Sequence, residues 1–205
     1  MTELNYYFQA GDPAQAPLLM LHGTGGYEDE LVPLAQKIAP NSPLLGIRGR
    51  LVENGRTRYF SHTATGGFDL NSLAQETTWL LQTIDQLAAK HHLAVNRMIV
   101  LGYSNGANMA AHAWLTGQVQ FKTGLLFHPM QVAPYKTVQP LSDVKIWASH
   151  GSFDPIVSAA NFQTLTQSLT TAQADLTVFE AEQSHALSPQ EITAAQQWLQ
   201  QSQRL

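Results

Sequence analysis

The turn Gly102–Gly106 constrains the fold of this chain more than any other feature, because of what flanks it. Residues 97–101 before it are apolar and β-prone, and residues 107–114 after it are small and helix-forming. A strand, a G-x-S-x-G turn and a helix form a nucleophile elbow, which holds a serine on a strained turn at the top of a parallel sheet. The bare pattern is common by chance, but in this context it predicts that Ser104 is a catalytic nucleophile.

The rest of the chain alternates strand-like and helix-like segments, which indicates a mostly parallel α/β sheet with helices on both faces. Strands are expected near 5–9, 17–21, 43–47, 97–101, 123–127, 144–149 and 175–179. Helices are expected near 28–38, 71–91, 105–116, 159–171 and 188–201. With 205 residues and 44% hydrophobic content, residues 1–205 are expected to form one domain with a sizeable core. The loop 129–141 is too short for a large cap domain, so we expect an open pocket suited to small acyl groups.

A serine hydroxyl needs a base and a carboxylate that orients the base. In hydrolases built on this elbow the order along the chain is Ser, then Asp or Glu, then His. Asp154 follows the strand 144–149, and His185 is the only one of eight histidines placed after both Ser104 and Asp154. The sequence therefore predicts a triad of Ser104, Asp154 and His185.

The rival carboxylates are placed less well. Asp143 and Asp175 precede their strands, at the wrong edge of the sheet. Glu180 and Glu182 come after the last strand and would have to act from the histidine's own loop.

The segment His22–Gly26 follows a buried-strand pattern and carries three glycines in five residues. Such a loop lets the backbone approach a ligand and point N–H groups into a site. We expect the N–H groups of Thr24 and Asn105 to form an oxyanion hole, with Gly23 beside the substrate. A phosphate-binding loop is the alternative, but neither G-K-[ST] nor G-x-G-x-x-G is present.

The polar segment 46–65 is long enough to be functional. We hypothesise that Arg56 and Arg58 hold an acidic or aromatic substrate within the Arg50–Phe60 loop. The equally weighted alternative is that these arginines pair with carboxylates such as Glu53. His128, after the strand 123–127, is expected to line the pocket.

Composition excludes several classes of function. A net charge of −4 with 11 Lys plus Arg argues against a nucleic-acid-binding surface. The chain has no cysteine, so disulfides and cysteine-based metal sites are excluded, and the scattered histidines contain no H-E-x-x-H metal motif. The first residues lack the features of a signal peptide, and no apolar segment has the length of a membrane span, which predicts a soluble, cytoplasmic protein. We expect the protein to need no metal or other cofactor. The oligomeric state stays open between a monomer and a homodimer formed through an apolar surface strip.

Several motifs carry a family resemblance: His22–Gly26, Arg48–Arg50, Glu53–Gly55, Gly102–Asn108 and His150–Pro155. Together they resemble the small carboxylesterase/phospholipase family of α/β-hydrolases, most closely the bacterial branch that includes hydroquinone-linked hydrolases. The resemblance covers nearly the whole chain. It implies a compact hydrolase domain, a Ser-Asp-His triad and activity on small carboxylic esters. One departure is Ser184, which stands before His185 where many members have glycine.

The favoured interpretation is a serine carboxylesterase acting on a small-molecule ester through an acyl-enzyme. A thioesterase or lysophospholipase would share every catalytic residue and differ in pocket shape. A role in quinone or hydroquinone detoxification is suggested by the resemblance alone. A binding module without turnover is disfavoured, because binding places no demand on the complete Ser, Asp, His order.

Overall fold

The computed structural model describes residues 4–117 and 119–202, so the outermost ends of the predicted domain lie outside the described residues. A seven-stranded sheet has the order β1-β3-β2-β6-β7-β8-β9, in which β1 is antiparallel to β3 and every other pair is parallel. The strands are β1 (Tyr6–Gln9), β2 (Leu18–Leu21), β3 (Leu44–Ile47), β6 (Ile99–Tyr103), β7 (Thr123–Phe127), β8 (Lys145–Gly151) and β9 (Asp175–Ala181). The helices are α1 (Val32–Ile38), α2 (Leu70–His91), α3 (Asn105–Leu115), α4 (Ala159–Thr171) and α5 (Pro189–Ser202), with a 3₁₀ turn η1 at Val95–Arg97.

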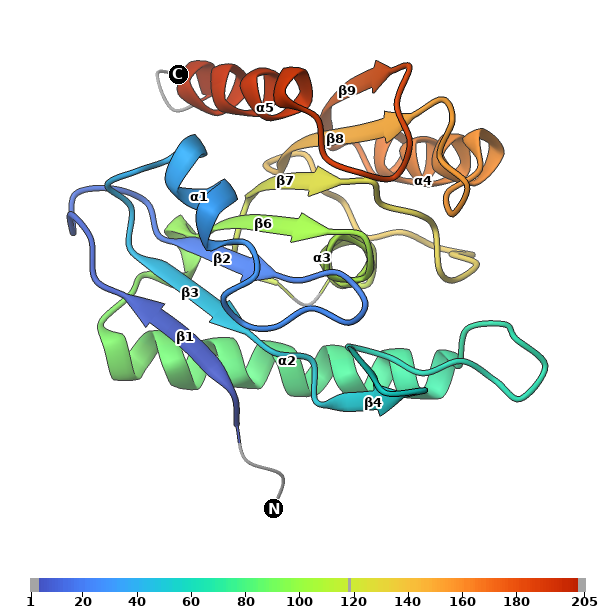
Figure 1. Cartoon of the computed structure of the whole chain (residues 1–205), viewed down its shortest axis with the longest axis horizontal. Coiled ribbons are helices and arrows are strands. Elements are labelled where there is room, and N and C mark those ends of the chain that lie inside the picture. The colour runs from blue at the N-terminus through green and yellow to red at the C-terminus, as the bar shows by residue number, and fades with distance from the viewer. Residues whose placement is uncertain (1–3, 118, 203–205) are drawn as a thin grey trace.

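Helices cover both faces of the sheet (Figure 1). Helices α2, α3 and α4 contribute to one buried apolar cluster, and α1 and α5 contribute to the other. The central strands supply both clusters by alternation, since Leu19 and Leu21 of β2 join the first and Leu18 and Met20 join the second. This is why β2 is apolar at every position. The arrangement confirms the predicted architecture.

The long helix α2 shows how the sequence specifies an element. Asp69 caps its start by accepting hydrogen bonds from the backbone N–H groups of Asn71 and Ser72. Its buried side includes Leu73, Leu80, Ile84 and Leu87, whose spacing keeps them on one face. The helix ends at His91 and is followed by the capping residue His92, which adopts a left-handed φ of 55°.

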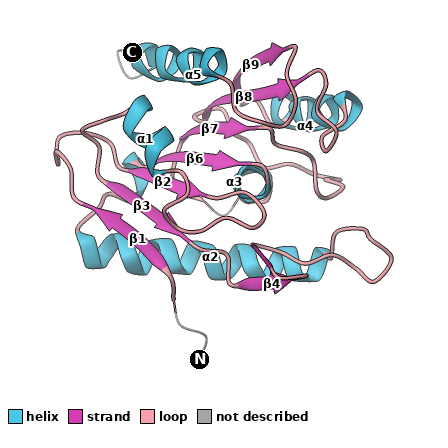
Figure 2. Ribbon diagram, viewed as in Figure 1, coloured by secondary structure: helices cyan, strands magenta, loops and turns pink. Residues whose placement is uncertain are grey.

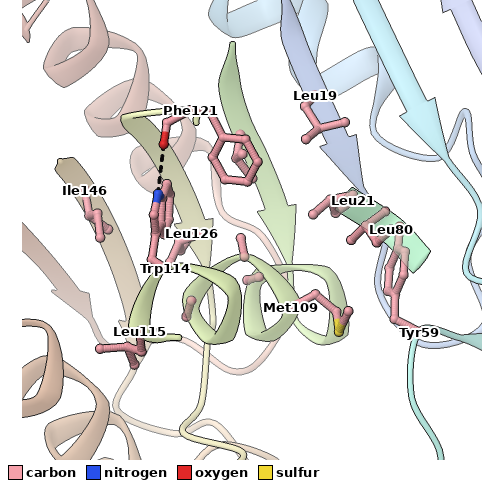
Figure 3. Close-up of a cluster of buried hydrophobic side chains, with 14 of the residues drawn as sticks. Leu19, Leu21, Tyr59, Leu80, Met109, Trp114, Leu115, Phe121, Leu126 and Ile146 are labelled. Carbon is pink, nitrogen blue, oxygen red and sulfur yellow. Dashed lines mark hydrogen bonds between the residues drawn. The ribbon is translucent and has the colours of Figure 1, made fainter. Parts of the chain in front are cut away.

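Helix α3 is fixed against the sheet by a tryptophan (Figure 3). The Nε1–H of Trp114 donates to the carbonyl of Phe121 at 3.0 Å. Its ring fills the space above Gly124 on β7, where an added Cβ would lie 2.2 Å from the ring. The helix that follows the elbow is thereby held close to the strand beside it.

Three predicted elements need correction. The segment 46–65, expected to be a loop, contains an antiparallel hairpin of β4 (Leu51–Glu53) and β5 (Arg56–Arg58), which is separate from the central sheet (Figure 2). Its turn is Asn54-Gly55, with φ of 51° and 74°, a dipeptide that favours tight hairpins. The strand expected at 97–101 is shifted to Ile99–Tyr103, because η1 takes up the residues before it. The helix expected from residue 28 begins at Val32, with proline in its first turn.

The connection between β7 and β8 contains neither helix nor strand, so the described chain carries no large cap there. Among the described residues, no helix combines the length and apolar character needed to cross a membrane.

Candidate active site

Five neighbouring parallel strands bring the candidate residues together. In sheet order β2, β6, β7, β8 and β9 are adjacent, and their carboxyl ends meet at one edge. Thr24, Ser104, His128, Asp154 and His185 follow these strands in the same order. Thr24 and His185, which are 161 positions apart in the sequence, therefore share one site.

Ser104 occupies a strained turn between β6 and α3. Its φ of 50° and ψ of −112° lie in a region that residues with side chains rarely adopt. The flanking glycines permit this turn: a Cβ at Gly106 would lie 2.1 Å from the carbonyl oxygen of Leu21, and one at Gly102 would lie 2.7 Å from Ala107 Cα. The structure thus has the tight strand–turn–helix geometry that the pattern predicts.

The predicted triad residues form a continuous hydrogen-bonded chain. His185 Nε2 lies 2.9 Å from Ser104 Oγ, and His185 Nδ1 lies 2.7 Å from Asp154 Oδ2. Asp154 Oδ1 accepts the backbone N–H groups of Ile156 and Val157 at 2.8 and 2.9 Å. This geometry would let His185 take a proton from the serine while Asp154 fixes its tautomer.

The Asp154 carboxyl remains ionised in this setting although its side chain is fully buried. Burial by itself would raise its pKa, but hydrogen bonds from Val157 N–H, the His185 ring and Ile156 N–H outweigh that effect. The pKa of Asp154 is therefore lower than its ordinary value. An ionised carboxylate is what a positively charged His185 would need beside it.

The loop after β2 leaves one N–H group without an acceptor. The N–H groups of Gly23, Gly25 and Gly26 donate to Glu30 Oε2, to Thr57 O and to Gly23 O at 3.1, 2.7 and 3.0 Å. The N–H of Thr24 has no acceptor within residues 4–117 and 119–202. Because Thr24 also lines the cavity beside Ser104, this N–H is available to a ligand there.

The turn at Ser104 leaves a second N–H group without an acceptor. Ser104 N–H donates to the carbonyl of Phe127 at 2.9 Å, and Gly106 N–H donates to the carbonyl of His22 at 3.0 Å. Between them, Asn105 N–H has no acceptor in the described part of the chain. Both predicted oxyanion donors are thus the unpaired members of otherwise satisfied loops.

Gly23 packs closely against Tyr103. Its N–H is occupied by Glu30, and a Cβ there would lie 2.8 Å from Cδ1 of Tyr103. Gly23 therefore makes room for the Tyr103 ring and its N–H is already paired, so its expected place beside the substrate stays a prediction.

The hairpin β4–β5 supports the loop that carries Thr24. Arg56 Nη2 donates to the carbonyl of Thr24 at 2.9 Å, and the Thr57 hydroxyl donates to the carbonyl of Gly26. Tyr59 N–H, just beyond the hairpin, donates to Asn105 Oδ1 at 2.8 Å. The segment taken for a loop thus fixes both sides of the candidate oxyanion hole.

The two arginines singled out in this hairpin differ. Arg58 also lines the cavity over Ser104, but it is buried and pairs with Glu53, which the His62 N–H also binds at 3.0 Å. The position of Arg58 matches the alternative in which the arginine pairs with a carboxylate. Arg56 is exposed, lines the cavity and has no carboxylate partner in the described part of the chain.

The cavity over Ser104 has a volume of about 480 Å³. Its polar end is formed by Thr24, Ser104, Asn105 and His185, and its apolar wall by Phe68, Met130, Ile156 and Val157. Arg56 and His62 lie at its rim. The volume suits a small ligand bound with its reacting group at the polar end.

His128 does not line this cavity, which corrects the expectation for it. Its side chain is fully buried behind Asp154, with Nδ1 3.0 Å from Asp154 Oδ2. On its other side Nε2 lies 3.2 Å from Oε1 of Glu191, a fully buried carboxylate that sequence reasoning missed.

One signal for Glu191 was present in the sequence. Ser188 and Glu191 form a capping box at the start of α5, in which Glu191 N–H donates to Ser188 Oγ and Ser188 N–H donates to Glu191 Oε2, both at 3.2 Å. That pattern marks a helix start and says nothing about what the glutamate faces.

Among the described residues, His128, Asp154 and His185 are the group whose potential metal-ligand atoms lie within 4.8 Å of one another. Asp154 Oδ2 already accepts from both rings. A cation bound there would compete with the hydrogen bond that orients His185.

Comparisons with known proteins agree on one family. The family model described as Phospholipase/Carboxylesterase matches residues 61–203. The putative hydrolase MhqD of Bacillus subtilis (strain 168) is 34% identical over 181 residues, which are 88% of this chain and 90% of that protein. The solved structure of YahD with malic acid is 40% identical with a TM-score of 0.93, covering 97% of this chain and 99% of that one. The Bacillus cereus carboxylesterase is 33% identical with a TM-score of 0.92, covering 97% and 94%.

Proposed function

This chain belongs to the phospholipase/carboxylesterase family of α/β hydrolases, and from that premise we propose that it is a serine carboxylesterase for small esters. Ser104 is the nucleophile, His185 the general base and Asp154 the residue that orients it. The observation that carries this proposal is the chain of hydrogen bonds from Ser104 Oγ through His185 to Asp154, at 2.9 and 2.7 Å, beside two unpaired N–H groups.

The proposed reaction has two stages. His185 Nε2 takes the Ser104 proton as Oγ attacks the ester carbonyl, and the Thr24 and Asn105 N–H groups receive the oxyanion. The alcohol leaves with the proton from His185, and an acyl-enzyme remains. Water then gives a proton to the same nitrogen, attacks the acyl group and releases the acid.

Small esters fit the cavity better than long-chain lipids. A volume of about 480 Å³ with an apolar wall of Phe68, Met130, Ile156 and Val157 holds a short acyl chain. The described chain has no large cap over Ser104 to extend that wall. Hydrolysis of p-nitrophenyl butyrate should therefore exceed that of long-chain esters.

The first test is hydrolysis of p-nitrophenyl acetate and butyrate by the wild type and by Ser104→Ala. Turnover should disappear in Ser104→Ala and persist in Ser152→Ala, which removes an exposed hydroxyl nearby. A fluorophosphonate probe followed by mass spectrometry should modify Ser104 in the wild type. Labelling without ester turnover would reject the substrate class, whereas failure of both would reject the nucleophile.

Thioesters and lysophospholipids require the same residues, so parallel assays of those substrates decide between them and simple esters. The same assay with hydroquinone esters addresses the detoxification alternative.

One observation favours substrates that carry a carboxylate. Arg56 presents a guanidinium at the rim without a carboxylate partner in the described chain, and the related YahD was solved with malic acid, a small dicarboxylic acid. Monoesters of dicarboxylic acids would place their free carboxylate within reach of such a group. A lower KM for monoethyl succinate than for ethyl butyrate would support this preference, and equal values would reject it.

A further inference from the structure

His128 and Glu191 are fully buried ionisable groups that the proposed reaction does not use. His128 follows β7 and adopts a left-handed φ of 51°. This conformation turns its ring beneath Asp154, with ring centroids of His128 and His185 5.0 Å apart. The two histidines therefore share one carboxylate oxygen, Asp154 Oδ2, at 3.0 and 2.7 Å.

Both ring nitrogens of His128 face a carboxylate oxygen. Nδ1 lies 3.0 Å from Asp154 Oδ2, and Nε2 lies 3.2 Å from Glu191 Oε1. A neutral imidazole has one N–H and one lone pair. With Nδ1 protonated, Nε2 would accept from the Gln183 amide, whose Nε2 lies 3.4 Å away, and Glu191 Oε1 would have no positive partner in the described chain. An imidazolium would donate to Asp154 Oδ2 and would place its positive charge beside Glu191 Oε1, 3.2 Å from Nε2.

The neighbours of Glu191 support an ionised carboxylate. Oε2 accepts from the Gln183 amide at 2.9 Å and from Ser188 N–H at 3.2 Å. Oε1 accepts no hydrogen bond of good geometry in the described chain, so the His128 ring is the positive partner available to it. A buried carboxylate without a cation would be costly.

We propose that His128 is held as an imidazolium between Asp154 and Glu191, and that this ion triplet positions the Asp154 carboxylate for His185. His128 and Glu191 are positioning residues in this proposal, which rests on the proposed function for its catalytic consequence. The Asp154 carboxylate then has four donors: the N–H groups of Ile156 and Val157 on Oδ1, and the two rings on Oδ2. With every lone-pair direction used, it has little freedom to turn away from His185.

The pKa directions agree with this assignment. Burial lowers the pKa of His128, but the Glu191 and Asp154 carboxylates outweigh burial and raise it above its ordinary value. Burial raises the pKa of Glu191, and the influence of its neighbours His128, Ser149 and Gln183 brings that pKa below its ordinary value. The other ionisable groups facing the His128 ring are His185 and Tyr103, and burial raises the pKa of Tyr103 to about 12, so its hydroxyl stays neutral.

His112 is a matched control within the same protein. It is also buried, but its Nδ1 faces the hydroxyl of Tyr135 at 2.8 Å. With no carboxylate on the ring, burial lowers its pKa to about 4. The two buried histidines should therefore differ in charge at neutral pH, with His128 positively charged and His112 neutral.

The test is long-range ¹H–¹⁵N NMR of the whole chain labelled on histidine, recorded above the pH at which a free imidazole loses its proton. The His128 signals, identified by their loss in His128→Asn, should show both nitrogens protonated. His112 should show a neutral ring. In Glu191→Gln the His128 ring should become neutral. A neutral His128 ring in the wild type would overturn the imidazolium.

The positioning role is tested by the kinetics of His128→Asn, because asparagine tolerates the left-handed φ and can still donate to Asp154. We expect kcat to fall about 10- to 100-fold with KM unchanged, since the loss is in orientation. The double variant His128→Asn/Glu191→Gln should be more resistant to urea than His128→Asn alone, because no unpaired carboxylate remains buried. Unchanged kcat in folded His128→Asn would overturn the positioning role.

These readouts separate the two proposals. The charge of His128 is measured without any substrate, so failure of Ser104→Ala to abolish turnover would reject the proposed function and leave the imidazolium standing. His112→Asn should leave kcat and the His128 signals unchanged. Loss of the His128 imidazolium in His112→Asn would show that the NMR pattern reports general packing and would overturn the assignment.

Discussion

Two clusters near the candidate site combine histidine with carboxylate and differ in their access to water. The buried cluster is Asp154, His128 and Glu191, whose side chains are all 0% exposed. The rim cluster is Glu53, Arg58 and His62, in which the Glu53 and His62 side chains are 27% and 34% exposed. Both clusters contain a histidine between charged groups, so their chemistry is alike. They differ in how far solvent reaches them.

The difference teaches where a charge can affect the reacting atoms. The side chains of the buried cluster are out of contact with bulk solvent, so each charge affects its neighbour strongly. The buried cluster also adjoins the proposed triad directly, since Asp154 belongs to both. Around the rim cluster water screens the charges, which reduces their contribution. Charges at the rim should therefore affect binding and local stability, and charges in the buried cluster should affect turnover.

The largest expected effect is on turnover. Asp154→Asn should lower kcat by about 10⁴, because an amide can hold His185 in the wrong tautomer. Glu53→Gln, the same chemical change in the rim cluster, should lower kcat by less than about 10-fold, since Glu53 does not contact the triad. Steady-state kinetics on a p-nitrophenyl ester measure both. Similar losses in the two variants would break the comparison.

The next effect is on stability. Glu191→Ala should destabilise the fold by about 3–5 kcal/mol, because it leaves the His128 ring buried without its partner. Glu53→Ala should cost about 1 kcal/mol, since water reaches the groups left behind. Urea denaturation gives both values. A larger loss for Glu53→Ala would show that the rim cluster, through buried Arg58, matters more than its exposure suggests.

The two clusters also mark what sequence reasoning can reach. The convergence of Ser104, Asp154 and His185 was predictable because strand ends of a parallel sheet meet at one edge and the order Ser, Asp, His is typical of this elbow. His128 follows a strand in the same way, but no pattern told whether its ring faces the cavity or the interior. That depended on its left-handed φ of 51°, which is a tertiary property.

Glu191 and the hairpin were missed for a related reason. The capping box of Ser188 and Glu191 predicts a helix start, and glutamates in such boxes are usually solvated. Asn-Gly is a dipeptide typical of hairpin turns, but the flanking strands of three residues are too short for periodicity to identify. Local sequence signals determine the helix start and the turn. The residues that Glu191 and the hairpin contact are determined by the packing of distant segments.

A smaller effect separates the clusters by pH. The pKa of Glu53 is lowered from 4.5 to about 2, mainly by the backbone N–H of His62 and then by its ring. A carboxyl with a lowered pKa stabilises the fold above its unfolded pKa, so this contribution is lost as the pH falls from about 4.5 toward 2. His128 has a raised pKa, so its contribution is complete below 6.5 and is lost as the pH rises through the higher folded value.

The unfolding free energy measured against pH should therefore show two separable declines. Glu53→Gln should weaken the acid decline and keep the alkaline one. His128→Asn should remove the alkaline decline that belongs to this ring and keep the acid decline of Glu53. If one variant altered both limbs equally, the clusters would be coupled and the comparison would fail.

The smallest expected effect concerns Arg56, which lies beside the rim cluster without belonging to it. Arg56→Ala should raise KM for a monoester of a dicarboxylic acid by about 10-fold and leave kcat nearly unchanged, because an exposed arginine would hold the substrate equally in the ground state and the transition state. For a neutral ester of the same length KM should not change. Arg56→Lys keeps the charge and should recover part of the affinity. However, Arg56 also donates to the carbonyl of Thr24, so a loss of kcat on both esters would assign it to the support of the oxyanion loop instead. The ratio of KM effects on the charged and neutral esters therefore decides whether the rim contributes recognition or only architecture.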